Sequence, residues 1–255
     1  MTQSIKEIEQ ILNSIDTDDD PRLNEWKRDS RKGVTKLLKS FNLKMKKKHE
    51  LHKKFTEMQV FEKEARMKNY TIVAGIDEVG RGPLAGPVVA AAVVLPETFY
   101  LPGLDDSKKL SDNRKSFLYE EIQKKAVSIG IGYAEAKEID DVNIYQATKL
   151  AMSRAIEDLD IVPQMLLIDA MALETNIPQE SIIKGDARSI SIAAASVVAK
   201  VTRDRYMGKL AKSHPHYKFE KNAGYGTREH LEGLQSHGPC IEHRMSFAPV
   251  KTLKN

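Results

Sequence analysis

The chain has one cysteine, Cys240, among its 255 residues, and it has no long apolar run. A single cysteine excludes an internal disulfide framework and is typical of proteins kept in a reducing compartment. No uninterrupted hydrophobic segment approaches the ~20 residues that a membrane helix needs. The first residues, Met1–Glu7, also lack the basic-then-apolar order of a signal peptide. We therefore expect a cytoplasmic protein without a membrane partner.

The basic residues are concentrated in one segment. Hydrophobic residues make up 41% of the chain and charged residues 30%, which is typical of a globular protein with a core. The net charge is only +4, but the segment from Lys27 to Lys54 holds twelve Lys/Arg and two acids. This segment carries +10 and leaves about −6 for the rest of the chain. Clustered lysines attract phosphate backbones without reading their sequence; a solvated helical face is the alternative explanation.

The pattern of apolar residues divides the chain into two parts. In residues 1–70, apolar side chains recur at helical spacing from Ile5 to Ile15 and again around Trp26–Phe41 and Leu51–Phe61. We expect a basic, helical N-terminal extension there. The pattern of residues 71–255 predicts an α/β domain that includes a C-terminal helical segment at about 214–255.

The second part alternates between strand and helix patterns. The predicted strands are 71–79, 88–95, 128–136, 165–169 and 181–183, and the predicted helices are 112–126, 141–159, 190–211 and 227–235. This order predicts a mixed five-stranded sheet with helices on both faces.

Acidic residues occur where predicted buried strands end. Asp77 and Glu78 end the first strand, Asp169 ends a later one, and Asp186 follows the last. Strand ends meet at one edge of an open α/β sheet, where four carboxylates would repel each other unless cations lay between them. Oxygen donors without His or Cys favour Mg²⁺ or Mn²⁺. Two such ions, ~3.5–4 Å apart, can activate water and stabilise the leaving oxygen of a phosphodiester.

The adjacency of Asp77 and Glu78 raises a geometrical problem, because neighbouring residues of a strand point to opposite faces. Gly80 and Gly82 would let the chain turn or bulge at this point. We therefore expect Glu78 to lie at a break in the strand.

Five segments resemble the bacterial ribonuclease HII family over about residues 71–245. They are Gly75–Pro87, Asp105–Leu110, Lys184–Asp186, Ser189–Arg205 and Gly224–Thr227. The resemblance implies a ribonuclease H-like fold and two Mg²⁺ or Mn²⁺ ions. It also implies a monomeric endoribonuclease that cuts the RNA strand of RNA/DNA hybrids and incises at single ribonucleotides embedded in duplex DNA. The products would carry 5′-phosphate and 3′-hydroxyl ends.

The resemblance also implies roles for individual residues. Catalytic and metal-holding roles fall to the four carboxylates, Asp77, Glu78, Asp169 and Asp186. The loop Gly80, Arg81 and Gly82 would sense the ribose 2′-hydroxyl, the group that distinguishes RNA from DNA, and Tyr225 would stack on the sugar at the RNA–DNA junction. Arg81 and Asp186 favour this family over the related ribonuclease HIII group, which lacks the arginine and ends its carboxylate set in glutamate.

Further substrate contacts are expected from polar residues in the matched segments and at the start of one helix. They are Lys108, Asn143, Lys184, Ser196 and Lys200. Helix capping explains Asn143 equally well, Lys108 could belong to a solvated loop, and Ser196 and Lys200 would be ordinary helix residues without the resemblance.

Three other functions agree less well with the sequence. A zinc site built from the five histidines after residue 213 conflicts with the single cysteine and the irregular spacing. A module that binds hybrid duplexes without cutting them has no need of four acids at strand ends. A phosphotransferase would need glycines followed by Lys-Ser/Thr, and the loop at residues 80–86 does not match this pattern.

Overall fold

A computed structural model of the chain describes residues 3–254. The chain forms two compact units, of which the first ends at Thr56 and the second begins at Glu57. The sequence placed this boundary at residues 70/71, so helix α4 (Val60–Met67) lies in the second unit instead of in the extension. In the described residues, no helix has the length and apolar character needed to cross a membrane.

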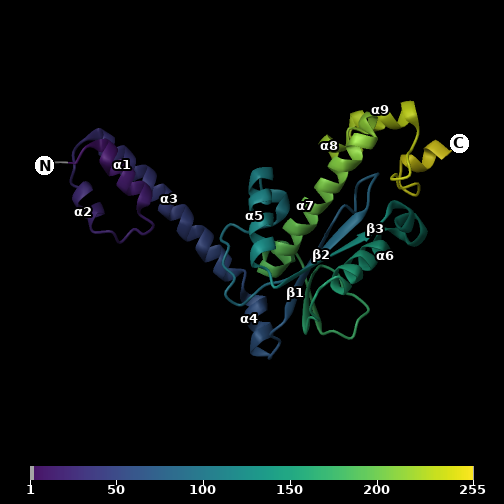
Figure 1. Cartoon of the computed structure of the whole chain (residues 1–255), viewed down its shortest axis with the longest axis horizontal. Helices are drawn as coiled ribbons and strands as arrows, with labels where there is room; N and C mark the ends of the chain where they lie inside the picture. Colours follow the sequence, from purple (N-terminus) through teal and green to yellow (C-terminus); the bar gives the residue numbers. More distant parts are fainter. Residues whose placement is uncertain (1–2, 255) are drawn as a thin grey trace. The chain divides into compact units, whose positions relative to one another are not determined.

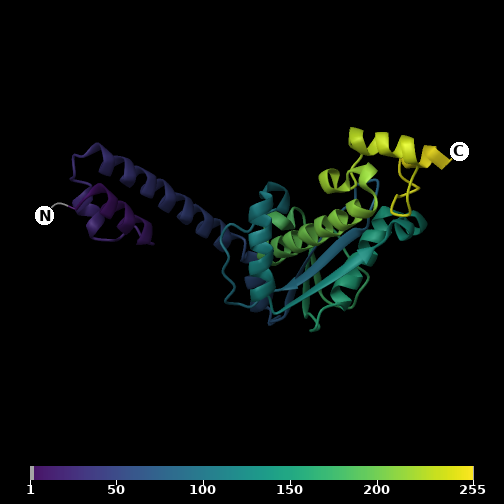
Figure 2. The same cartoon turned by 45° about the horizontal axis from the view of Figure 1, so that its top comes forward.

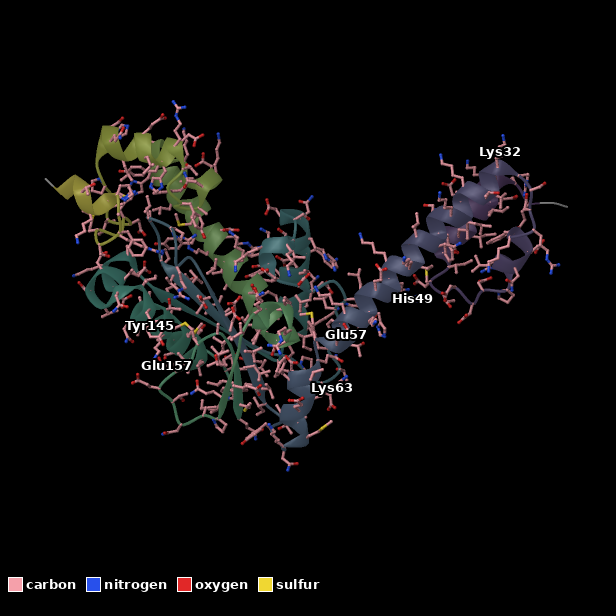
Figure 3. The ribbon with its side chains drawn as sticks, turned by 180° about the vertical axis from the view of Figure 1, so that it is seen from behind. Lys32, His49, Glu57, Lys63, Tyr145 and Glu157 are labelled. Carbon is pink, nitrogen blue, oxygen red and sulfur yellow. The ribbon has the colours of Figure 1, made fainter. Side chains whose placement is uncertain are left out.

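The first unit is helical, as the apolar spacing predicts. It contains α1 (Ile5–Ser14), α2 (Arg22–Trp26) and most of α3 (Lys32–Glu57), a helix along which Figure 3 labels Lys32, His49 and Glu57. Apolar side chains from the three helices form one buried cluster: Ile8, Leu12, Ile15, Leu23, Trp26, Val34, Leu38, Phe41 and Met45. This cluster holds the unit together and leaves most of the lysines of α3 on its surface.

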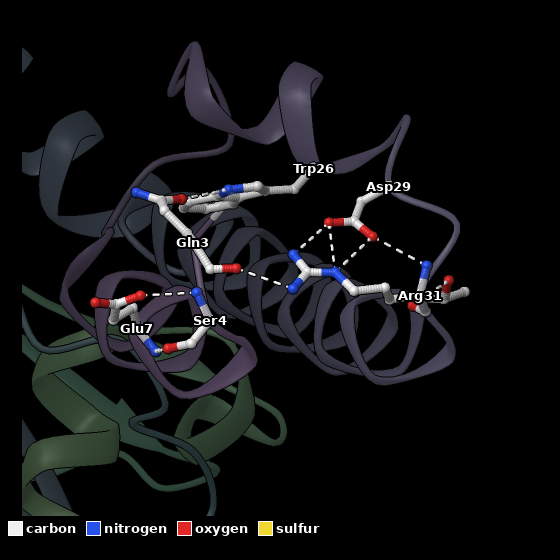
Figure 4. A network of polar contacts seen from close by, with 7 residues as sticks. Gln3, Ser4, Glu7, Trp26, Asp29 and Arg31 are labelled. Carbon is white, nitrogen blue, oxygen red and sulfur yellow. Dashed lines mark hydrogen bonds and ion pairs between the residues drawn. The ribbon is translucent and has the colours of Figure 1, made fainter. Parts of the chain in front are cut away.

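A polar network joins the residues just before α1 to the end of α2 and to the segment between α2 and α3 (Figure 4). The Trp26 indole N–H donates to the Gln3 side chain at 2.9 Å, and Arg31 donates to the Gln3 carbonyl at 2.9 Å. Arg31 also pairs with Asp29. Such partly exposed pairs each contribute little free energy, so the buried cluster carries most of the stability of this unit.

The second unit is built on a mixed five-stranded sheet with the order β3-β2-β1-β4-β5. The strands are β1 (Val73–Val79), β2 (Val88–Val94), β3 (Ser128–Ala134), β4 (Met165–Asp169) and β5 (Gln179–Ile182). The antiparallel pairs are β1–β2 and β2–β3, whereas β1–β4 and β4–β5 are parallel. The predicted five-stranded mixed sheet is confirmed, and β1 and β4 end at the same edge.

Two long helices cover opposite faces of this sheet, as Figures 1 and 2 show. Helix α6 (Ala136–Glu157) packs on Ala74 and Ile76 of β1, and α7 (Ile190–Ser213) packs on the other face, against Gly75. Helix α5 (Asp112–Lys125) lies against α7. The backbone of α6 is interrupted at Asn143, where φ is 70°, so the helix predicted from residue 141 corresponds to the second half of α6.

The remaining elements are short turns and helices. They are η1 (Ser107–Lys109), η2 (Gly185–Ala187), η3 (Pro215–Tyr217), α8 (Phe219–Asn222), α9 (Arg228–His237) and η4 (Val250–Lys254). The C-terminal segment packs on the second half of α7 and on the loop between β1 and β2. Its core consists of Leu84, Ala85, Met207, Ala211, Tyr217, Phe219, Leu234 and Val250.

A buried carboxylate joins α4 to α7. Glu62 is 2% exposed, and its Oε1 accepts hydrogen bonds from the Ser189 and Ser191 hydroxyls at 2.5 and 2.6 Å. The same oxygen accepts the Ser191 N–H at 3.0 Å. These donors lie at the start of α7, where helix N–H groups lack partners and a negative charge is favoured. This contact explains why α4 belongs to the second unit.

Glycines allow the close approach of helices to the sheet. A Cβ added to Gly132 of β3 would lie 2.0 Å from the Ala151 carbonyl oxygen of α6. We therefore predict that Gly132→Ala destabilises the protein by about 1–3 kcal/mol, the usual range for overpacking. Gly208→Ala in α7 is the matched control, because a Cβ there meets no atom within 4 Å; it should be neutral or stabilising by up to about 1 kcal/mol through helix propensity. Urea unfolding measures both, and equal midpoints for the two variants would contradict the packing described for α6.

Candidate active site

Asp77 and Glu78 both lie within a regular strand. Asp77 pairs with Ala91, Glu78 with Ala90, and the register continues to Val79 opposite Val89. The backbone leaves strand geometry only at Gly80, where φ is +93°. The expectation that Glu78 sits at a break in the strand is therefore wrong: the ladder with β2 holds it in place.

The two acids point to opposite faces of the sheet but are close to the same third carboxylate. Asp77 faces α7, where Ser196 partly opposes the rise of its pKa, and Glu78 faces the other side by strand alternation. Asp169 ends the neighbouring parallel strand β4, and its charge acts on both. The acidic group thus surrounds the end of the sheet instead of lying on one face.

A turn after β5 completes the acidic group. The Gly185 N–H donates to Asp169 Oδ1 at 2.7 Å, which fixes η2 against the end of β4. Asp186, the next residue, is 7% exposed and lies near enough to Asp169 for the two charges to interact. The structure therefore brings together all four acids that the sequence singled out.

Burial and mutual repulsion raise the pKa of three of these acids. Burial, followed by the charges of Glu78 and Asp169, raises the pKa of Asp77 well above its ordinary value. Burial also raises the pKa of Glu78, although Arg81, whose guanidinium lies 3.4 Å from Glu78 Oε1, partly opposes this. The pKa of Asp186 rises through burial and through the charges of Asp106 and Asp169. In all three acids, burial and neighbouring negative charges outweigh the positive charge nearby.

The donor set fits a divalent cation. In the described part of the chain, no three Asp, Glu, His or Cys side chains lie close enough to hold a metal ion as they stand. However, Glu78 Oε2 is buried and has no hydrogen-bond partner, and buried charged oxygens are costly without one. Oxygen donors of this kind suit Mg²⁺ or Mn²⁺.

The turn η1 adds polar groups to this edge of the sheet. The Ser107 hydroxyl lies 2.9 Å from that of Ser196, and both residues are buried. Burial alone would lower the pKa of Lys108, but the charges of Asp106 and of Asp77, Asp186 and Asp169 outweigh it and raise that pKa. Lys108 therefore lies close enough to the acids for their charges to act on it, and its contact with substrate stays a prediction. Asp106 and Ser107 are not among the residues predicted from the sequence, although both lie in the matched segment Asp105–Leu110.

Two of the three other predicted contacts, Asn143 and Lys200, have structural partners of their own. Asn143 Oδ1 accepts the N–H groups of Tyr145 and Gln146 at 3.0 and 3.2 Å, so the capping explanation is confirmed. Lys200 donates to Asp204 at 2.7 Å, one turn along α7. Lys184 is exposed and precedes η2 in a left-handed conformation. A substrate contact for each of the three stays a prediction.

Two buried arginines hold the loop that follows β1. Arg244 donates to the carbonyls of Gly80, Arg81 and Gly86, and Arg203 donates to those of Ala85 and Pro87. Both side chains are almost fully buried, and burial lowers their pKa values to about 9 for Arg244 and about 10 for Arg203. The sequence does not single out either arginine, because buried guanidinium groups that serve backbone carbonyls leave no spacing signal.

Tyr225 lies beside the same loop. Its ring Cε1 is 3.5 Å from the point where a Cβ on Gly82 would stand, and the side chain is half exposed. The Leu84 N–H donates to the Gly224 carbonyl at 2.8 Å, and a Cβ on Gly224 would lie 2.4 Å from the Ala85 carbonyl oxygen. The structure thus places the tyrosine and the glycine–arginine–glycine loop together, next to the acids.

Comparison with known proteins points to one family. The family described as "Ribonuclease HII" matches residues 74–250, and its "Ribonuclease HII N-terminal domain" matches residues 4–66. The chain is 52% identical over 250 residues to a ribonuclease HII of Bacillus cytotoxicus, covering 98% of this chain and 96% of the relative. It is 54% identical over 252 residues to one of Bacillus cereus, covering 99% and 98%.

Solved structures share the fold. The ribonuclease H2 of Pyrococcus horikoshii matches with a TM-score of 0.62 at 25% identity, over 71% of this chain and 96% of the other. A ribonuclease HIII described as Bst-RNase HIII, in complex with Mn²⁺, matches with a TM-score of 0.57 at 17% identity, over 72% and 69%. The chain belongs to the ribonuclease HII family of metal-dependent endoribonucleases, which act on RNA/DNA hybrids.

Proposed function

We propose that this protein also incises duplex DNA at single embedded ribonucleotides, using two Mg²⁺ or Mn²⁺ ions. The observation that carries this proposal is the position of Tyr225 and Gly82 beside the acidic end of the sheet. A site that must recognise one ribose within DNA needs a sugar-reading surface directly next to its cutting groups. A ribonuclease that reads only the shape of a hybrid does not need this adjacency.

The four acids would hold the cations and give the site its charge. Asp77, Glu78, Asp169 and Asp186 are the proposed ligands, and the unpartnered Glu78 Oε2 is a free donor oxygen among them. When bound, a pair of divalent cations activates water and stabilises the leaving oxygen of a phosphodiester. Lys108 would counter the negative charge of the substrate phosphate on the same edge. The products would carry 5′-phosphate and 3′-hydroxyl ends.

The loop after β1 would recognise the ribose. Arg244 fixes the peptide groups of Gly80 and Arg81 through their carbonyls, so these groups keep one orientation when a nucleotide arrives. Gly82 is exposed and carries no side chain, so a sugar can approach its backbone closely. The exposed ring of Tyr225 would stack on the neighbouring deoxyribose. A binding module that only sensed hybrids would not need the buried acids next to these groups.

The first unit would add affinity for duplexes without reading their sequence. The lysines Lys36, Lys39, Lys44 and Lys47 are exposed on α3. A row of lysines on a helix suits contacts with successive phosphates.

We predict that Asp77→Asn lowers the rate of incision by about 10²–10³-fold or more, the usual cost of losing one charge-stabilising group. The substrate is duplex DNA that carries one ribonucleotide, with Mg²⁺ or Mn²⁺ present, and single-turnover rates give the measurement. Asp160→Asn is the matched control, because Asp160 is exposed before β4, at the opposite end of that strand from Asp169.

The proposal would be overturned if the wild type failed to incise this duplex, or if Asp77→Asn incised it as fast. Incision that continued after chelation of all divalent cations would contradict the role of the metal. Ligation of the nicked product, before and after phosphatase treatment, identifies the ends.

We predict that replacing Lys36, Lys39, Lys44 and Lys47 by Gln weakens duplex binding and flattens its dependence on salt. Each lost phosphate contact should reduce the slope of log K against log[salt] by about 0.9. The rate at saturating substrate should not change, because the substitutions lie outside the second unit. An unchanged slope across a salt series would show that α3 does not contact the duplex.

A further inference from the structure

Two buried histidines in the C-terminal segment have no part in the reaction described above. His230 of α9 and His243 are 0% and 1% exposed, and their Nε2 atoms lie 2.9 Å apart. His230 Nδ1 lies 2.9 Å from the Tyr225 carbonyl oxygen. On the other side, His243 Nδ1 lies 2.9 Å from the Cys240 backbone nitrogen. The four groups form a continuous hydrogen-bonded chain from Cys240 to Tyr225.

The ends of this chain determine where its protons lie. The Cys240 N–H can only donate, so His243 Nδ1 accepts, and a neutral His243 carries its proton on Nε2. The Tyr225 carbonyl can only accept, so His230 Nδ1 carries a proton and its Nε2 is free to accept. The His243 Nε2–H therefore donates to His230 Nε2. One arrangement of neutral tautomers satisfies every contact.

A proton added to either ring would break the chain. A charged His230 would place two N–H groups head to head at the 2.9 Å contact with His243. A charged His243 would do the same at Cys240. The rings of Tyr217 and Phe219 pack around the pair, and burial, followed by the charge of His230, lowers the pKa of His243 to about 4. The pair is thus neutral near pH 7.

The chain of bonds ends at the peptide group of the residue that lies against Gly82. The Tyr225 carbonyl also accepts the Thr227 N–H at 2.8 Å, so two donors hold it. Glycines stand on both sides of Tyr225, and by themselves they would leave its backbone free to rotate. His230 adds a side-chain restraint on this peptide to two backbone bonds, from the Thr227 N–H and from the Tyr225 N–H to the Asn222 carbonyl at 2.9 Å.

We propose that His230 and His243 are positioning residues for recognition of the RNA–DNA junction: their neutral tautomeric chain fixes the Tyr225 peptide, and through it the ring that lies beside Gly82. The inference rests on the proposed incision at single ribonucleotides, because Tyr225 is the group through which it acts. Metal binding does not explain the pair, since Cys240 Sγ lies 3.2 Å from His243 Nδ1, on the far side of the ring from the nitrogen that meets His230.

Two different substitutions of His230 test its two hydrogen bonds one at a time. His230→Asn places an amide N–H near the position of Nδ1, so it keeps the bond to the Tyr225 carbonyl and loses the bond to His243. His230→Gln places its amide near the position of Nε2, so it keeps the bond to His243 and loses the bond to Tyr225. Thermal unfolding of both variants shows whether they are folded.

We expect His230→Gln to lower kcat/KM on a duplex with one ribonucleotide by about tenfold, the loss that one buried hydrogen bond can cause. The same variant should retain its kcat/KM on a hybrid with a fully RNA strand, which presents no deoxyribose to Tyr225. His230→Asn should retain the preference for the junction. Equal losses on the two substrates, or a larger loss of preference in His230→Asn than in His230→Gln, would overturn the proposal.

A double-mutant cycle tests whether His230 acts through Tyr225. In a Tyr225→Ala background, His230→Gln should change kcat/KM on the single-ribonucleotide duplex by less than about twofold, because the ring that it positions is already gone. A full tenfold loss in that background would show that the histidine supports the structure in general and does not position the tyrosine.

Nitrogen-15 NMR of histidine-labelled wild-type protein tests the chain without any activity measurement. The expected spectrum at pH 7 shows His230 protonated on Nδ1 and His243 protonated on Nε2. If the wild type does not incise at single ribonucleotides, the proposed function fails. The role of the histidine pair in recognising the junction then fails with it. The tautomers would still show whether the chain of hydrogen bonds exists. The opposite tautomer on either ring, or a charged ring at pH 7, would refute the chain itself.

Discussion

The repulsion among buried carboxylates at one end of the sheet is the constraint on which the rest of this site depends. Parallel pairing of β1 and β4 forces Asp77 and Asp169 to the same edge, and η2 adds Asp186. Folding keeps these charges together although burial and their proximity raise the pKa values of Asp77 and Asp186. An arrangement that is unfavourable for the protein alone would become favourable with divalent cations between the oxygens, as proposed above.

The loop beside the acids is held by a different kind of interaction. Residues 80, 82 and 86 are glycines, so the loop has no side chains at these positions that could hold it by packing. Arg203 from α7 and Arg244 from the C-terminal segment replace that packing with hydrogen bonds to backbone carbonyls. A loop whose proposed role is to let a nucleotide approach its backbone can therefore still be rigid. The two arginines that restrain the loop lie more than a hundred residues away from it in the sequence.

Much of the fold and of the acidic group follows from the sequence, because both depend on local patterns. Runs of β-branched residues indicate the strands. Acidic residues directly after those runs indicate which side chains lie together at the edge where the strands end. The predicted strand break at Glu78 is wrong, because the acids do not need one common face: they surround the end of the sheet. Arg203, Arg244 and the His230–His243 pair were missed for another reason. Their partners are backbone atoms or distant side chains, and no spacing in the chain encodes such contacts.

The contact of Glu62 with the start of α7 bears on how the N-terminal unit could be exchanged between proteins. The N-terminal family segment extends to residue 66 and so includes this glutamate, although physically α4 belongs with the sheet. Recombination at the family boundary would strip α7 of its carboxylate cap and leave Ser189 and Ser191 without their acceptor. Recombination near Thr56 would leave this cap in place. The segment that matches the N-terminal family therefore differs from the first compact unit by one short helix, α4. Loss or replacement of the extension would keep the contact between α4 and α7 only if the break in the chain lay before α4.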